Sequence, residues 1–226
     1  MKEILAVRHV EIEGLGEFEE ILNEIGLKFL YLDVWKNDIE KSQLKNFDGF
    51  IILGGYMGVY EYERYPFLKN SFLVAEYSLE TEKPIMGICL GSQILAYVLG
   101  ARVFKGHKKE IGWYDVFKTG EHKLFDDFPQ RFTAFHWHGD TFDLPKGAQR
   151  VFSSSLYENQ TFVFGKAVGI QFHLEVGKKM IKHWAEEYEK ELADEGISTE
   201  NLKNQKDEVF DNLKKLSKNL LNKIFK

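Results

Sequence analysis

The sequence predicts an α/β fold built on a doubly wound, mostly parallel sheet with an antiparallel extension and C-terminal helices. Over residues 4–99, short apolar runs alternate with helical patterns, which is typical of parallel strands joined by crossover helices. After residue 100, strand-like runs follow one another with turns between them, which favours antiparallel pairing. From residue 178 onward, two amphipathic helical patterns complete the chain.

The first half contains apolar runs with the composition of strands buried in a parallel sheet. They cover residues 4–7, 27–34, 50–53 and 83–86. The helical pattern after the first run places Phe18, Ile21 and Ile25 on one face and ends at Gly26. Residues 36–45 form a polar, partly helical connection. Pro66 opens the next helix, and residues 92–100 form a helix closed by glycine.

The second half contains four strand-like runs and then helices. The runs cover residues 110–117, 131–137, 149–153 and 161–173, with a hairpin turn at Gly165. Val209, Leu213, Leu216, Leu220 and Ile224 form an amphipathic stripe near the C-terminus. We expect residues 1–195 to form one domain and residues 196–226 a helical extension packed on it. A stripe that serves as an interface with a partner is the alternative.

Composition excludes several classes of function. With 44% hydrophobic and 15% aromatic residues, the chain has enough apolar material for one large core. A net charge of −5 without a basic block argues against nucleic acid as a partner. The single cysteine excludes a disulfide framework and a cysteine-based zinc site. We expect no membrane span, no signal peptide and a cytoplasmic location.

The only cysteine, Cys89, lies between a predicted strand and a predicted helix in the run Gly-Ile-Cys-Leu-Gly-Ser-Gln of residues 87–93. A glycine two places before it and another two places after it permit a sharp turn that lifts the side chain out of the sheet. Serine hydrolases use this geometry in G-x-S-x-G, where the amide after the nucleophile helps to form the oxyanion hole. A thiol at a helix N-terminus would be a nucleophile. A buried, inert cysteine is the alternative.

A thiol nucleophile needs a base, and the base needs an orienting partner. His173 ends a strong apolar run and is followed by Leu174 and Glu175. Alternation in an extended segment puts His173 and Glu175 on the same side. The carboxylate could therefore bind one imidazole nitrogen and leave the other to face Cys89.

Two further groups of candidate functional residues lie at or near predicted strands. Gly54 and Gly55 end the third strand, where their amides could approach a ligand and complete an oxyanion hole. A phosphate loop is disfavoured because no Gly-Lys-Ser/Thr sequence follows. His136 and His138 alternate around Trp137, which suggests a metal site, but further ligands are not evident. We favour a substrate-lining loop there and expect no metal and no cofactor.

These stretches together resemble the class I, or triad, glutamine amidotransferases. The resemblance rests on P-I-M-G-I-C-L-G-S-Q at residues 84–93, on Gly54-Gly55, and on G-I-Q-F-H-L-E at residues 169–175, and it extends from Ile4 to about Trp184. Within the family, the chain is similar to the amidotransferase domain of GMP synthases and to free-standing relatives that include γ-glutamyl peptidases. It departs from the family where Tyr56 follows the two glycines and where Trp137 replaces a serine. The resemblance implies a flavodoxin-like sheet.

The resemblance also implies roles for individual residues. Cys89 would attack the side-chain amide of glutamine, or a γ-glutamyl amide, and form a thioester. His173 would activate the thiol and protonate the leaving amine, while Glu175 orients His173. The amides of Gly55 and Leu90 would stabilise the oxyanion. The substrate would be held by Gly54, Gln93, Trp137 and His138.

The resemblance leaves the fate of the ammonia open, because the sequence carries no ATP-pyrophosphatase signature and no P-loop. Either a separate synthase subunit receives the ammonia, or the chain acts alone as a γ-glutamyl hydrolase, peptidase or transferase. A cysteine peptidase or stress protein of the DJ-1/PfpI type shares the nucleophile turn and is a different alternative. A binding module that keeps the triad only as architecture is the non-enzymatic one.

Overall fold

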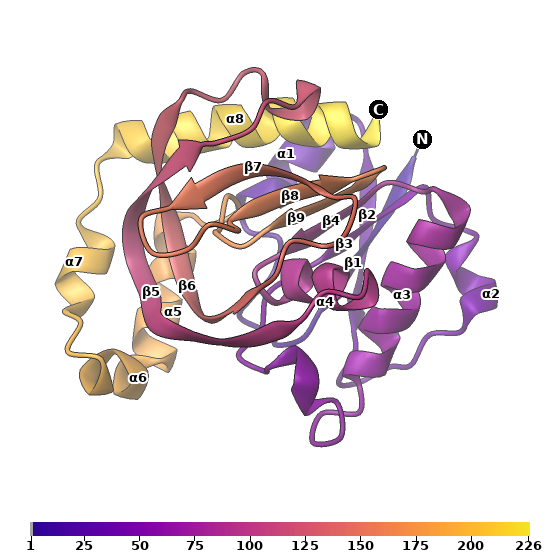
Figure 1. Cartoon of the computed structure of the whole chain (residues 1–226), viewed down its shortest axis with the longest axis horizontal. Helices are drawn as coiled ribbons and strands as arrows, with labels where there is room; N and C mark the ends of the chain where they lie inside the picture. Colours follow the sequence, from indigo (N-terminus) through magenta and orange to yellow (C-terminus); the bar gives the residue numbers. More distant parts are fainter. Residues whose placement is uncertain (1) are drawn as a thin grey trace.

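The computed structural model describes residues 2–226, in which one sheet of nine strands forms the centre of the molecule (Figure 1). The strands lie in the order β2-β1-β3-β4-β9-β8-β7-β5-β6. Their bounds are β1 Glu3–Arg8, β2 Lys28–Asp33, β3 Gly49–Ile52, β4 Ile85–Ile88, β5 Val103–Lys118, β6 Arg131–Phe142, β7 Gln149–Ser154, β8 Thr161–Phe164 and β9 Ala167–Ile170.

Strand β9 joins the parallel and antiparallel parts of this sheet. Strands β2, β1, β3, β4 and β9 pair in parallel, and β9 pairs with β8 in the antiparallel sense through a hairpin at Gly165, whose φ is 56°. Strands β8, β7, β5 and β6 continue as antiparallel pairs. The predicted fold class, a doubly wound mostly parallel sheet with an antiparallel extension, is therefore confirmed. Strands β5 and β6 are longer than predicted because they pair with each other beyond the apolar runs.

Helices cover both faces of the parallel part. Their bounds are α1 Glu17–Glu24, α2 Lys41–Leu44, α3 Leu68–Thr81, α4 Leu90–Val98, α5 Lys178–Glu187, α6 Glu189–Asp194, α7 Thr199–Lys203 and α8 Asp207–Phe225, with 3-10 turns at Val59–Glu61 and Lys123–Phe125. Alternate residues of β1 enter different cores. Ile4 and Ala6 pack with α1 and α8, whereas Leu5 and Val7 pack with α2, α3 and α4. A strand buried on both faces explains why the parallel strands are continuous apolar runs.

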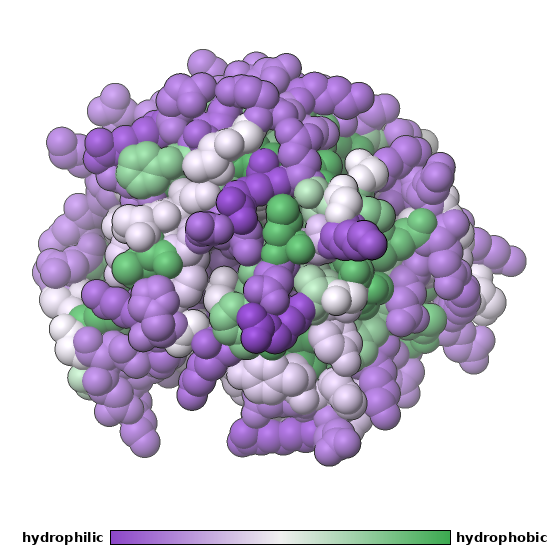
Figure 2. Space-filling model, viewed as in Figure 1, coloured by the Kyte–Doolittle hydropathy of each residue, from purple (hydrophilic) through white to green (hydrophobic). Residues whose placement is uncertain are grey.

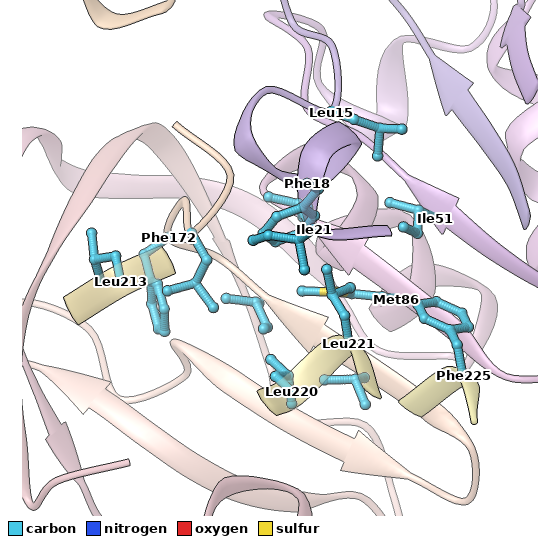
Figure 3. Close-up of a cluster of buried hydrophobic side chains, with 14 of the residues drawn as sticks. Leu15, Phe18, Ile21, Ile51, Met86, Phe172, Leu213, Leu220, Leu221 and Phe225 are labelled. Carbon is cyan, nitrogen blue, oxygen red and sulfur yellow. The ribbon is translucent and has the colours of Figure 1, made fainter. Parts of the chain in front are cut away.

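Helix α8 lies across the top of the view in Figure 1, close to α1, and its side chains enter the core beneath it. Figure 3 shows Leu220, Leu221 and Phe225 of α8 beside Ile21 of α1 and Met86 of β4. The most deeply buried positions are shifted around the helix from the predicted stripe, so that Val209, Leu216 and Ile224 lie at its margin. The division into a domain of residues 1–195 and an extension of residues 196–226 packed on it stays a proposal.

Helices α5 to α7 pack against the middle of strands β5 and β6. Trp184 of α5 packs with Phe135 of β6, and the same cluster includes Ile111 of β5 and Leu202 of α7. On the face in Figure 2, hydrophilic side chains dominate the periphery and apolar ones gather toward the middle. Within residues 2–226, no helix combines the length and the apolar character that crossing a membrane requires.

Candidate active site

Cys89 occupies a strained turn between β4 and α4. Its backbone has φ 50° and ψ −110°, a conformation that a non-glycine residue rarely adopts. Its amide donates a 2.8 Å hydrogen bond to the carbonyl of Ile170, so the turn begins directly at the end of the β4–β9 ladder. Residues held in such conformations cost about 1–3 kcal/mol and cluster at functional sites. The turn is the strand-to-helix elbow that the sequence predicts.

Gly87 and Gly91, on either side of Cys89, have no room for a side chain, although neither has a positive φ angle. A Cβ on Gly87 would collide with the backbone of Gly91 and Ser92, and a Cβ on Gly91 would collide with the carbonyl of Ile52. The elbow therefore packs backbone against backbone on both sides. Leu90 follows as the first residue of α4, where the amide has no partner four residues earlier in the helix.

His173 and Glu175 lie beside this elbow. The amide of His173 donates to the carbonyl of Phe135 at 2.8 Å, which fixes the residue against β6. Its Nδ1 donates to Oε1 of Glu175 at 2.6 Å, and both side chains are buried. Nε2 of His173 is buried without a hydrogen-bond partner among residues 2–226. The predicted pair therefore forms, with the second ring nitrogen left for another group.

The charge of His173 depends on two opposing effects. Burial lowers the pKa of an imidazole, but the Glu175 carboxylate and the neighbouring Cys89 side chain outweigh burial and raise the pKa of His173 well above 6.5. The imidazolium is therefore favoured, and it is the partner that a thiolate at Cys89 needs. In this structure Sγ of Cys89 lies 3.5 Å from the carbonyl oxygen of Trp137. The ring of Trp184 packs edge-on against His173 at 5.0 Å between centroids.

His9 holds the glycines that follow β3. Its Nδ1 donates to the carbonyl of Gly54 at 2.9 Å, and the hydroxyl of Ser71 lies 2.8 Å from its Nε2. A carbonyl only accepts, so Nδ1 carries the hydrogen, and burial lowers the pKa of His9 to about 4, which keeps the ring neutral. The Gly54 carbonyl and the Gly55 amide belong to one trans peptide and point in opposite directions. By fixing the carbonyl, His9 also fixes where the Gly55 amide points.

Of the four predicted substrate residues, Gln93, Trp137 and His138 line one cavity of about 450 Å³ together with Cys89 and His173. Gln93 donates from Nε2 to Oε1 of Gln171 at 3.1 Å, so its Oε1 is the atom left for a ligand. Trp137 contributes a ring whose Nε1 donates to Glu191 at 3.0 Å. Gly55 lines the cavity, and Gly54 lies beneath it against Cys89.

His138 also lines the cavity, but both of its ring nitrogens are engaged. Nδ1 donates to the carbonyl of Asp140 at 2.9 Å, and Nε2 lies 2.9 Å from Oε2 of Glu110. A direct bond to substrate would therefore replace one of these contacts. Glu110, His136 and His138 form a buried group with metal-ligating atoms within 4.8 Å of one another. Glu110 is the nearby ligand that sequence reasoning lacked, since its strand, β5, is paired with β6 only in the fold.

Residues of the site that the sequence did not indicate include His9, Glu13, Trp184 and Tyr188. His9 and Glu13 follow β1, and parallel sheets place ligands at the carboxyl ends of their strands. That rule could have indicated both. In the sequence, Trp184 and Tyr188 are ordinary positions on the apolar face of a predicted helix. Only the fold brings them to the cavity.

Comparisons with known proteins identify the family to which the chain belongs. A family model described as "Glutamine amidotransferase class-I" matches residues 17–186. The chain is 33% identical over 150 residues to a glutamine-hydrolyzing GMP synthase from Thermomicrobium roseum, covering 65% of this chain and 27% of that protein. A second such synthase, from Aliivibrio fischeri, is 30% identical over 173 residues, covering 72% and 32%. The chain thus spans about a third of the length of these curated relatives.

A solved structure extends the likeness to the full chain. A glutamine amidotransferase from Thermotoga maritima is 49% identical, superposes with a TM-score of 0.95, and covers 100% of this chain and 98% of its own. The family model matches well over half of the chain, and the synthase from Aliivibrio fischeri, at 30% identity, covers more than two thirds of it. This chain therefore belongs to the class I glutamine amidotransferase family.

Proposed function

We propose that this chain hydrolyses the side-chain amide of glutamine, or of a γ-glutamyl compound, through a thioester on Cys89. The observation that supports this most is the meeting of the strained Cys89 turn with the His173–Glu175 pair at one cavity. Neither half is specific alone. Together they supply a nucleophile, a base and an orienting carboxylate, which is the arrangement that acyl transfer requires.

In the first half of the reaction, Sγ of Cys89 attacks the amide carbon. Nε2 of His173 holds the proton that the Cys89 thiol has given up, and this imidazolium then protonates the leaving nitrogen as the C–N bond breaks. Negative charge develops on the carbonyl oxygen, where the amides of Leu90 and Gly55 would donate hydrogen bonds. Glu175 keeps Nδ1 of His173 protonated and stabilises the imidazolium.

In the second half, water attacks the thioester. Nε2 of His173 takes a proton from the water, and the tetrahedral intermediate collapses to glutamate and the Cys89 thiol. The glutamyl end of the substrate would be held by Oε1 of Gln93 and by the backbone beside His138. Trp137 would close the apolar side of the cavity. Burial of the triad excludes bulk water from the reacting atoms.

The destination of the ammonia is a separate question. Whole GMP synthases are about three times longer than the stretch of them that this chain matches, so their synthetic activity does not transfer to it. We propose that a separate synthase subunit receives the ammonia. The alternative is a γ-glutamyl hydrolase or peptidase that acts alone, and a search for partner-stimulated glutaminase activity distinguishes the two.

A diazoketone analogue of glutamine tests the proposed chemistry. We expect covalent labelling of Cys89 with loss of one dinitrogen per chain, detected by mass spectrometry of the intact protein, and protection by excess glutamine. Iodoacetamide provides the control for general thiol reactivity. Excess glutamine should reduce labelling by iodoacetamide less than it reduces labelling by the diazoketone. A protein that releases no glutamate and leaves Cys89 unlabelled is a binding module, and the proposal is then wrong.

His9 gives a prediction for the oxyanion site. We expect His9→Leu to lower kcat about 10–100-fold with little change in KM, because loss of one oxyanion donor typically costs ~10²–10³-fold and here the donor is misaligned rather than removed. His9→Asn should recover much of kcat, since its side-chain amide can still donate to the Gly54 carbonyl. Ser71→Ala should have a smaller effect than His9→Leu. Equal losses in the Leu and Asn variants would contradict this role.

A further inference from the structure

Glu13 is a buried carboxyl in the active site that the proposed triad does not use. It lies in the loop between β1 and α1, is 7% exposed and lines the same cavity as Cys89 and His173. Its Oε1 accepts a 2.9 Å hydrogen bond from the hydroxyl of Tyr188, which holds the carboxyl against the C-terminal helices. Burial of an acid costs free energy, so its position calls for a reason.

The space above Gly54 shows how close Glu13 is to the chemistry. A methyl group built on Gly54 would collide with Oε2 of Glu13, and it would lie 3.5 Å from Cε1 of His173 and 3.7 Å from Cβ of Cys89. The three side chains therefore surround one point. Cε1 adjoins Nε2 in the imidazole ring, and Nε2 is the atom that would protonate the leaving nitrogen. Glu13 thus lies near Cε1 of His173, one bond away from Nε2.

The charge of Glu13 is not balanced by a permanent cation. No lysine or arginine of residues 2–226 forms an ion pair with it. Burial raises the pKa of Glu13 from 4.5 to about 7, with smaller opposing effects from His173 and Tyr188. The titratable groups that interact with it are His173, Tyr188, Tyr56, Glu175 and Glu191. Near neutral pH a large fraction of the carboxyl therefore carries a proton that it can give away.

We propose that Glu13 protonates the amine released from the thioester-forming step and holds it as an ammonium ion. This inference rests on the proposed function. The amine leaves as neutral R–NH₂ after His173 has supplied one proton. The carboxylic acid of Glu13 then transfers its proton to the nitrogen lone pair, which gives R–NH₃⁺ paired with the Glu13 carboxylate. No bond to carbon changes, and no further reactant is needed.

The energetics favour this transfer. A primary amine has a pKa near ~10, so it takes a proton readily from an acid of pKa about 7. The rings of Trp137 and Tyr188 line the same cavity and can stabilise a cation by their π faces. The ligand class is therefore ammonia or a small primary amine.

Protonation of the released amine prevents it from re-forming the amide. Only the unprotonated amine can attack the thioester and regenerate the amide. Protonation removes its lone pair, so the thioester is left for water. Glu13 would therefore set the partition between hydrolysis and reversal, while Cys89 and His173 set the rate at which the thioester forms.

Exchange of labelled ammonium into glutamine measures this partition. Enzyme, glutamine and heavy-nitrogen ammonium chloride are mixed, and labelled glutamine formed per glutamate released is measured by mass spectrometry. We expect Glu13→Gln to raise this ratio about tenfold, since a positioned acid–base group typically contributes ~10²–10⁴-fold to a proton transfer. Glu11→Gln makes the same chemical change at an exposed position of the same loop and should leave the ratio unchanged.

The pH dependence gives a readout that a structural role would not produce. The exchange ratio, labelled glutamine per glutamate released, is measured for both proteins across pH. The ratio of Glu13→Gln should exceed that of the native protein most below pH 7, and the difference should shrink above pH 7 as Glu13 loses its proton. The native protein alone also tests the idea, whether or not the variant folds. After correction for free ammonia, its exchange ratio should rise as pH passes through about 7.

The possible failures are distinguishable. If the native protein forms a thioester and releases glutamate, but its corrected ratio is flat with pH or equals that of Glu13→Gln, the role of Glu13 is wrong and the proposed function stands. If the native protein forms no thioester, both are wrong.

Discussion

Replacement of Cys89 by alanine is expected to lower the release of glutamate from glutamine by at least ~10³-fold, because removal of a covalent nucleophile eliminates the thioester route. The loss should appear in kcat rather than in glutamine binding, since Gln93 and the cavity wall are unchanged. Steady-state kinetics with glutamine and with a panel of γ-glutamyl amides measures it. Turnover equal to that of the native protein would contradict the proposed function.

The strained backbone supplies a matched control for Cys89→Ala. Alanine at φ 50° keeps the strain, whereas glycine adopts that conformation freely. Cys89→Gly should therefore be as inactive as Cys89→Ala but more stable by about 1 kcal/mol in denaturant unfolding, the usual scale of a left-handed non-glycine residue. Such a result would show that the turn holds the thiol at a cost in stability. Equal stability of the two variants would mean that the turn is not strained.

Glu175→Gln is expected to lower kcat/KM by about 10²–10⁴-fold, because an amide can present its NH₂ group to Nδ1 and reverse the tautomer of His173. Loss of the carboxylate charge also lowers the pKa of His173. The alkaline limb of the pH–rate profile should therefore move to lower pH, since the leaving amine needs an acid. Glu186→Gln, an exposed change on α5, is the control.

The same substitution predicts a change in stability with pH. The pKa of His173 is raised well above 6.5 in the folded protein, so its stabilising contribution is complete below pH 6.5 and is lost as pH rises through the folded pKa. The free energy of unfolding of the native protein should fall above pH 6.5 for this reason. Glu175→Gln should show a weaker fall over the same range. Parallel curves for the two proteins would assign the pH dependence to other groups.

Local pattern was sufficient to predict the fold class and the candidate triad. Apolar runs such as residues 50–53 indicate strands buried on both faces, and the spacing of Phe18 and Ile21 indicates the buried side of a helix. The glycines around Cys89 predict the elbow because only their small size permits it. His173 and Glu175 are two residues apart, so alternation alone predicts that their side chains meet.

Other parts of the site depend on which distant segments become neighbours. Local periodicity tells which face of a segment is buried, but it does not tell which strand lies beside it. The parallel pairing of β4 with β9 aligns Ile88 with Ile170 and so brings His173 to Cys89. The pairing of β5 with β6 gives His138 its Glu110 partner. Neither pairing can be predicted from the local sequence pattern of the strands that form it.

The turn at Cys89 and the His-x-Glu pair were therefore determined by the sequence itself, because the physical rules that shape them act over a few residues. The tertiary structure alone decided the roles of His9 and Glu13, since each acquires its chemistry from a group far along the chain. His9 is neutral and directional because it is buried between Gly54 and Ser71. We propose Glu13 as a proton donor because burial raises its pKa to about 7 and because no lysine or arginine among residues 2–226 forms an ion pair with it. Burial changes what a side chain can do, and burial is a property of the whole fold.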